Sequence, residues 1–318
     1  MNAAQLREGL IGVAMPGMAG LLFALAGFWL GSYLKRRNDR SKIAKRIERL
    51  GPPIGFGLGY LLVLLSVQGT PPTLKLSSIS ASHWQLIFLC VAIVFALAES
   101  FSLRATKQPA IRWFGRFVLV AGVLVFQLSS ARKYQWEPGV EQIAWTAGVG
   151  LWMLFAFGAL DLLSVRARVT SASLSLAAIP ALAIPAIFDS GATAQWQIAL
   201  AVASALFGIA LVGMIFRERY IGQALGTIYI VWLGGMLVVA HLYSEMPAWR
   251  AGLLAALPFA VLIPERWPKL CRHRRFAIRM AIIAAVCLAV SWGAIPGFLE
   301  TLTGGGGSSD YDYYSMAR

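Results

Sequence analysis

Charged residues are scarce in this chain of 318 residues: only 13% are Asp, Glu, Lys or Arg, whereas 58% are hydrophobic. A soluble fold of this length needs more polar side chains than that to cover its surface. The composition therefore excludes a soluble globular protein and indicates an all-α polytopic membrane protein.

Long polar loops are missing as well. The loops between apolar stretches reach only about 18 residues, whereas an independent soluble domain needs about 50. The three cysteines, Cys90, Cys271 and Cys287, are too few and too dispersed to predict a disulfide or a metal cluster. Any working site must be built from helix faces and short loops.

Familiar enzyme motifs are also absent. The sequence has no Gly-x-Ser-x-Gly elbow, no P-loop, no His-Glu-x-x-His and no aspartate-rich pair for magnesium. We therefore expect no metal and no cofactor, and a non-catalytic role rather than an enzyme. A membrane enzyme acting on lipids through Glu99, Asp161 and nearby arginines stays open as a third alternative.

What the chain does contain is a series of ten apolar stretches. A bilayer core takes about 20 helical residues, and barrel strands would be half as long and alternating, so helices are predicted. The stretches are residues 10–34, 54–67, 84–103, 113–131, 142–165, 169–188, 194–216, 220–243, 249–264 and 276–299. The second and ninth are short and lie beside prolines, which leaves open whether they span fully.

The loop charges predict the orientation. Alternate loops hold 22 of the 28 basic residues, and basic short loops stay on the cytoplasmic side. The 22 are Lys35, Arg36, Arg37, Arg40, Lys42, Lys45, Arg46, Arg49, Arg104, Lys107, Arg112, Arg116, Arg166, Arg168, Arg217, Arg219, Arg266, Lys269, Arg272, Arg274, Arg275 and Arg279. Both termini are therefore expected outside, in a cytoplasmic membrane of bacterial type.

The same bias explains the net charge of +14, so no nucleic-acid partner is expected. The first inner loop, Lys35 to Leu50, has Ile43, Ile47 and Leu50 at helical spacing among the basic residues from Lys35 to Arg49. This pattern predicts an interfacial helix that contacts anionic lipids of the bilayer. A regulatory or partner-binding role for this segment is the alternative.

Two further features suggest contacts. Three GxxxG pairs, Gly27 with Gly31, Gly55 with Gly59 and Gly222 with Gly226, predict close helix packing, within the chain or with a protein partner. Residues 1–300 form the predicted transmembrane domain, and residues 301–318 a flexible outer tail rich in Gly, Ser and Tyr. The tail is either a docking segment or a segment without a role. In the second case it is either native or an added linker.

Helix breaks predict a binding site. Ten helices divide into two sets of five, and such halves would be inverted in the membrane, as in many secondary transporters. The first helix contains Pro16 and Gly17 and the sixth contains Pro180 and Pro185, and these two helices occupy corresponding positions in the two halves. Prolines expose backbone carbonyls that bind a ligand where a cavity exists; a packed kink is the alternative.

Ionisable groups within the stretches are few. Glu99 and Asp161 each lie five residues before an arginine, Arg104 or Arg166, and form either interfacial ion pairs or a proton site. Asp189, His241 and Glu245 form a second candidate ion or proton site at the outer side, to which His83 would add a further metal ligand, although the spacings match no zinc-hydrolase motif. The alternative is that they are surface residues at helix ends.

Two functions from different classes follow. The first is a permease or carrier for a neutral or lipophilic small molecule, with its cavity between the first and sixth helices. The second is a non-catalytic membrane subunit that anchors a larger assembly. Paired proline breaks favour the carrier, and the scarcity of buried polar residues favours the subunit.

Overall fold

The computed structural model describes residues 14–37, 47, 50–61, 81–101, 109–129, 139–216, 223–267 and 269–303. Within these ranges every regular element is helical. The elements are α2 (Met15–Arg37), α4 (Ala81–Phe101), α6 (Pro109–Gly122), the π-helix η3 (Val123–Gln127), α8 (Val140–Arg166), α9 (Val169–Asp189), α10 (Thr193–Phe216), α11 (Gln223–Leu242), α12 (Ala248–Ala260), the 3₁₀-helix η4 (Ile263–Arg266), α13 (Arg272–Ser291) and α14 (Ile295–Thr303). Residues 50–61 are also helical.

Seven of the described helices have the length and apolar composition needed to cross a bilayer. They are Met15–Tyr33, Pro109–Gln127, Val140–Arg166, Val169–Asp189, Gln195–Ile215, Leu225–Leu242 and Ala248–Arg266. These helices confirm an α-helical, multi-pass membrane protein. Ten spans with both termini outside stay a prediction.

The three other predicted stretches are not among these seven, for separate reasons. Residues 54–67 are described only as far as residue 61. Helix α4 is 21 residues long, and its apolar segment among the described side chains is Ile87–Glu99. The last stretch is divided between α13 and α14 by a turn at residues 292–294, and α13 begins with the basic run Arg272–Arg275.

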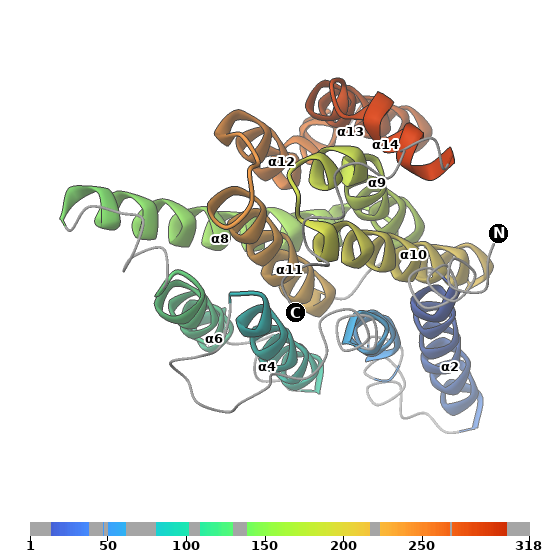
Figure 1. Ribbon diagram of the computed structural model, residues 1–318. Coiled ribbons are helices and arrows are strands. Elements are labelled where there is room, and N and C mark those ends of the chain that lie inside the picture. Colours follow the sequence, from blue (N-terminus) through green and yellow to red (C-terminus); the bar gives the residue numbers. More distant parts are fainter. Residues whose placement is uncertain are drawn as a thin grey trace, which may run out of the picture.

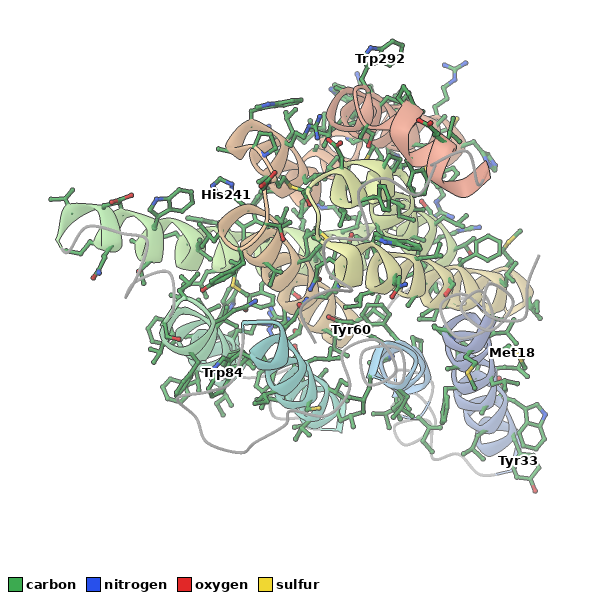
Figure 2. The ribbon with its side chains drawn as sticks, in the orientation of Figure 1. Met18, Tyr33, Tyr60, Trp84, His241 and Trp292 are labelled. Carbon is green, nitrogen blue, oxygen red and sulfur yellow. The ribbon has the colours of Figure 1, made fainter. Side chains whose placement is uncertain are left out.

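Helix α11 lies at the centre of the bundle. In its apolar window 89% of the residues are buried inside the molecule, against 22% for the window that spans α6 and η3. Helix α11 packs against α4 and α8, α10 packs against α9 and α2, and α13 packs against α9 (Figure 1). Peripheral α2 turns Met18 and Tyr33 away from the bundle (Figure 2), as expected of a lipid-facing helix.

The bundle has two ends that differ in charge. We call the basic end the one where α8 ends at Arg166 and α13 begins at Arg272. At the opposite end, α11 ends at Leu242 and α12 begins at Ala248. The candidate sites described below lie near one end or the other.

Small residues bring α2, the 50–61 helix and α10 into close contact. A Cβ atom added to Gly27 would lie 2.8 Å from the Cα of Gly51, and one added to Gly55 would lie 2.8 Å from the carbonyl oxygen of Ala19. A Cβ on Gly20 would collide with the carbonyl of Ala205. Gly27 and Gly55 of the first two GxxxG pairs therefore pack within the chain. Gly222, of the third pair, lies outside the described residues.

Candidate functional site

The structure separates the two proline breaks that the sequence pairs. Pro16 is buried where α2 meets Gly59 of the 50–61 helix, and Gly17 faces Ser204 of α10. Pro180 and Pro185 lie within α9. Helix α10 packs against both α2 and α9 (Figure 1). These four residues line neither the cavity between α8, α11 and α12, nor the groove between α6 and α8, nor the cavity at the basic end.

The first break in α9 is filled by a neighbouring helix. Pro180 has no N–H to donate to the carbonyl of Leu176, four residues earlier. The hydroxyl of Tyr229 in α11 donates to that carbonyl oxygen at 3.2 Å. Both Pro180 and Tyr229 are buried. The exposed carbonyl thus has a partner from the core, an arrangement typical of a packed kink.

The three members of the predicted outer cluster of ionisable residues do not form one site: two have separate partners and the third is exposed. Asp189 pairs with Arg250 at 2.5 Å. The Nδ1 atom of His241 lies 2.8 Å from the carbonyl oxygen of Met246, and the side chain of Glu245 is exposed. Among the described residues, no group of three or more His, Cys, Asp or Glu side chains is placed to hold a metal ion.

His241 nevertheless borders a cavity. A space of about 280 Å³ lies between the first half of α8, the second half of α11 and α12, near the opposite end. Its walls include Trp145, Trp152 and His241, with Gly148 and Gly252 at open positions where an added Cβ would meet nothing within 4 Å. Figure 2 shows His241 near the end of α11, beside the loop to α12.

The hydrogen bonds around this cavity define its chemistry. The indole N–H of Trp152 donates to the carbonyl of Ala255 at 2.8 Å. Because the Met246 carbonyl can only accept, Nδ1 of His241 donates to it, and the tautomer that carries its proton on Nδ1 leaves Nε2 as an acceptor. The rings of Trp145 and His241 lie 5.4 Å apart. The cavity therefore offers aromatic, apolar walls and one histidine acceptor.

The other two predicted site residues, Glu99 and Asp161, are brought together at the basic end. The guanidinium of Arg116 donates to both oxygens of Asp161, at 2.6 and 2.9 Å, and to Glu99 at 3.4 Å. Arg112, one turn earlier on α6, lies 3.3 Å from Asp161 and 3.7 Å from Glu99. Thr227 of α11 donates to Glu99 at 3.5 Å. We call these four charged residues the ionic cluster.

The ionic cluster is closed and balanced in charge, with two arginines facing two carboxylates. Arg116 is fully buried and lies over the rings of Trp113 and Phe157, at 5.5 and 5.3 Å. Bidentate pairing of this kind joins α4, α6 and α8 at one point. None of the four residues lines any of the three cavities, so the geometry suits a structural contact better than an ion path.

Sequence reasoning missed the buried glutamines. Gln195 of α10 donates to Gln85 of α4 at 3.1 Å, and Gln85 donates to the hydroxyl of Tyr60 at 3.1 Å. Gln127, at the end of η3, donates to the carbonyl of Gly235 in α11 at 3.2 Å. Each glutamine lies near the end of an apolar stretch, where sequence alone does not distinguish a buried amide from an interfacial one.

No protein-family model, no curated protein and no solved structure matches this chain.

Proposed function

We propose that the chain is a carrier for a neutral, largely apolar small molecule, and that the molecule binds in the cavity between α8, α11 and α12. The cavity itself carries the proposal: about 280 Å³ lined by tryptophan, aliphatic side chains and glycine, with His241 as a single acceptor. Such pockets bind apolar ligands and orient them through a few polar groups. The fitting ligand is aromatic or aliphatic and carries one N–H or O–H donor.

The position of the cavity favours transport of the ligand over binding without transport. Its inner wall is α11, the most buried helix, and its outer wall is formed by α8 and α12, whose windows are only 44% and 33% buried. A ligand there lies between the centre of the bundle and its lipid-facing helices. Small movements of α12 against α8 would open or close the site, which is the motion a carrier needs.

The test is binding of labelled indole, an apolar ring with one N–H donor, to the purified full chain in detergent. Gly252→Leu would fill the cavity, and we expect it to lower indole binding at least about tenfold, since the ligand loses its space. Gly297→Leu is the matched control, because Gly297 is also a helical glycine with open surroundings but lies on α14. Equal binding by both variants would contradict this site.

Transport is tested separately from binding. Proteoliposomes that contain the chain are loaded with unlabelled thymine, a neutral planar molecule that is more polar than indole, once competition against labelled indole has shown that thymine occupies the same site. Exchange with labelled thymine is then followed. We expect exchange in the wild type and in Gly297→Leu, and its loss in Gly252→Leu. Indole binding without exchange of thymine would restrict the proposal to ligand binding.

An anchoring subunit is the second candidate, and a groove favours it. Helix α8 projects beyond its neighbours (Figure 1), and its first half leaves an open apolar groove of about 570 Å³ against α6 and η3. A partner helix would fit such a groove. Purification in mild detergent with a mass measurement distinguishes the two candidates, because a stable complex of defined stoichiometry favours the subunit.

The membrane and the orientation of the chain are part of the same proposal. We place the chain in the cytoplasmic membrane of a bacterium, with the basic end inside, on the strength of its loop charges. We also keep the proposal that Lys35 to Arg49 bind anionic lipids and that the tail at 301–318 faces outward. Both segments lie almost entirely outside the described side chains.

A further inference from the structure

A second cavity, of about 560 Å³, lies at the basic end between the α8–α9 turn, the end of α10, η4 and the start of α13. Its lining contains five arginines and one acidic residue: Arg166, Arg168, Arg272, Arg275, Arg279 and Glu265. We call this space the arginine cavity.

Glu265 is already neutralised within the arginine cavity. Its Oε2 atom accepts from Arg275 at 2.9 Å, and its Oε1 atom accepts from Arg279. Arg279 is buried and also donates to the hydroxyl of Ser171 at 2.8 Å and to the carbonyl of Val261 at 3.0 Å. Arg275 and Arg279 against one carboxylate leave one positive charge, and Arg166, Arg168 and Arg272, which are exposed around the opening, add three more.

Two helices begin at this cavity, and both beginnings favour an anion. Helix α9 begins at Val169 and α13 at Arg272; neither has a side-chain cap or an acidic residue in its first turn. Thr170 and Ser171 from one helix and Arg272 and His273 from the other line the space. First-turn N–H groups have no partners inside their own helix and carry partial positive charge, which makes each helix start attractive to phosphate.

The walls are not wholly polar. Leu174 and Phe276 line the cavity, and Val165 and Met214 beside them are 56% and 60% exposed. In a membrane protein, exposed apolar side chains next to arginines are the surroundings of a lipid headgroup with its acyl chains alongside. A soluble anion would use the arginines alone.

We propose that the arginine cavity binds the phosphate group of an anionic amphiphile, a site distinct from the carrier cavity and from the Lys35–Arg49 segment. Arg168, Arg166 and Arg272 hold the phosphate oxygens together with the first-turn amides of α9 and α13. Arg275 and Arg279 are held in place by Glu265 and supply the positive floor. The acyl chains lie against Val165 and Met214.

Native mass spectrometry of the full chain in non-ionic detergent, titrated with phosphatidylglycerol, tests this proposal. The double variant Arg168→Gln with Arg272→Gln removes two lining charges, and we expect at least about tenfold weaker binding, since charge-assisted hydrogen bonds are lost. The matched control is Arg266→Gln with Arg274→Gln, which removes two exposed arginines from the same end that do not line the cavity. It should bind like the wild type.

The source of the phosphate is decided by competition. Failure of millimolar inorganic phosphate to displace phosphatidylglycerol supports a lipid ligand, and displacement supports a free phosphate compound at the same site. Met214→Glu, which adds a carboxylate at an exposed lining position, is the second variant and should also weaken binding. No binding of either probe by the wild type, or equal losses in the cavity variant and its control, would overturn the proposal.

Discussion

Arg116 is the fully buried cation of the ionic cluster, and its removal should be costly. Arg116→Leu would leave Glu99 and Asp161 buried with less positive charge, and breaking a buried pair costs about 3–5 kcal/mol. The combined change Arg116→Leu and Asp161→Leu restores the charge balance, so most of the lost stability should return. Thermal unfolding in detergent measures both.

The exposed ion pair at the opposite end provides the control for this experiment. Asp189 is 46% exposed in its pair with Arg250, and exposed pairs contribute less than about 1 kcal/mol. Arg250→Leu should therefore change the unfolding temperature only slightly. A loss as large as that of Arg116→Leu, or no gain from the combined change, would contradict the assignment of the ionic cluster as a structural contact.

Tyr229 and Pro180 should be coupled energetically. Tyr229→Phe leaves the Leu176 carbonyl without a donor, and an unsatisfied buried group costs about 1–3 kcal/mol. In a Pro180→Ala background, the new N–H of residue 180 can bond that carbonyl, and Tyr229→Phe should then cost much less. A double-mutant cycle measures the difference; equal costs in both backgrounds would show that the hydroxyl does not fill the break.

The sequence identified which ionisable residues lie within the helices, but it did not identify the residues with which they pair. The sequence indicated that Glu99 and Asp161 either pair with arginines or form a proton site, and it placed Arg112 and Arg116 in a basic loop. The structure instead places both arginines in α6 against the two acids. The missing information was the rotation of α6, which depends on packing against α4 and α8 and not on local spacing.

Close packing of α2, the 50–61 helix and α10 makes a prediction at the scale of elements. Gly55→Ala would place a methyl group 2.8 Å from the carbonyl of Ala19, and overpacking of this kind costs about 1–3 kcal/mol. Gly148→Ala is the control, since its added Cβ meets nothing within 4 Å. In thermal unfolding in detergent, Gly55→Ala should be less stable than the wild type. Gly148→Ala should be slightly more stable, because alanine has a helix propensity about 1 kcal/mol better than glycine at an open helical position.

The helices themselves were largely predictable, because long apolar runs in a bilayer have few alternatives to a helix. Two details were not. The π-helix η3 carries no sequence signal. Gln127 within it donates a hydrogen bond to a backbone carbonyl of α11, and the two residues are 108 positions apart in the sequence. The division between α13 and α14 at residues 292–294 was also missed, although Gly293 in the turn and Pro296 just after it are typical of a helix end and a helix start.

At the scale of the whole molecule, the cavities were beyond sequence reasoning, since each combines segments that are distant in the chain. The carrier cavity unites α8, α11 and α12, and the arginine cavity unites α8, α9, α10, η4 and α13. The proline breaks predicted a cavity between the first and sixth helices, but α10 packs against both. Sequence did predict the charge of the arginine cavity, as a property of loops on one side.

The side of the membrane that the basic end faces can be tested with the native cysteines. Cys271 is exposed at the basic end, whereas Cys90 is partly buried and Cys287 is buried among the helices. If the basic end faces the cytoplasm, a membrane-impermeant maleimide should label the chain in inverted vesicles and not in intact cells. Cys271→Ser should abolish the labelling. Labelling of Cys271 from the outside of intact cells would show that the basic end faces outward. Because Cys271 and the arginine cavity lie at the same end, the phosphate would then have to come from the outer leaflet.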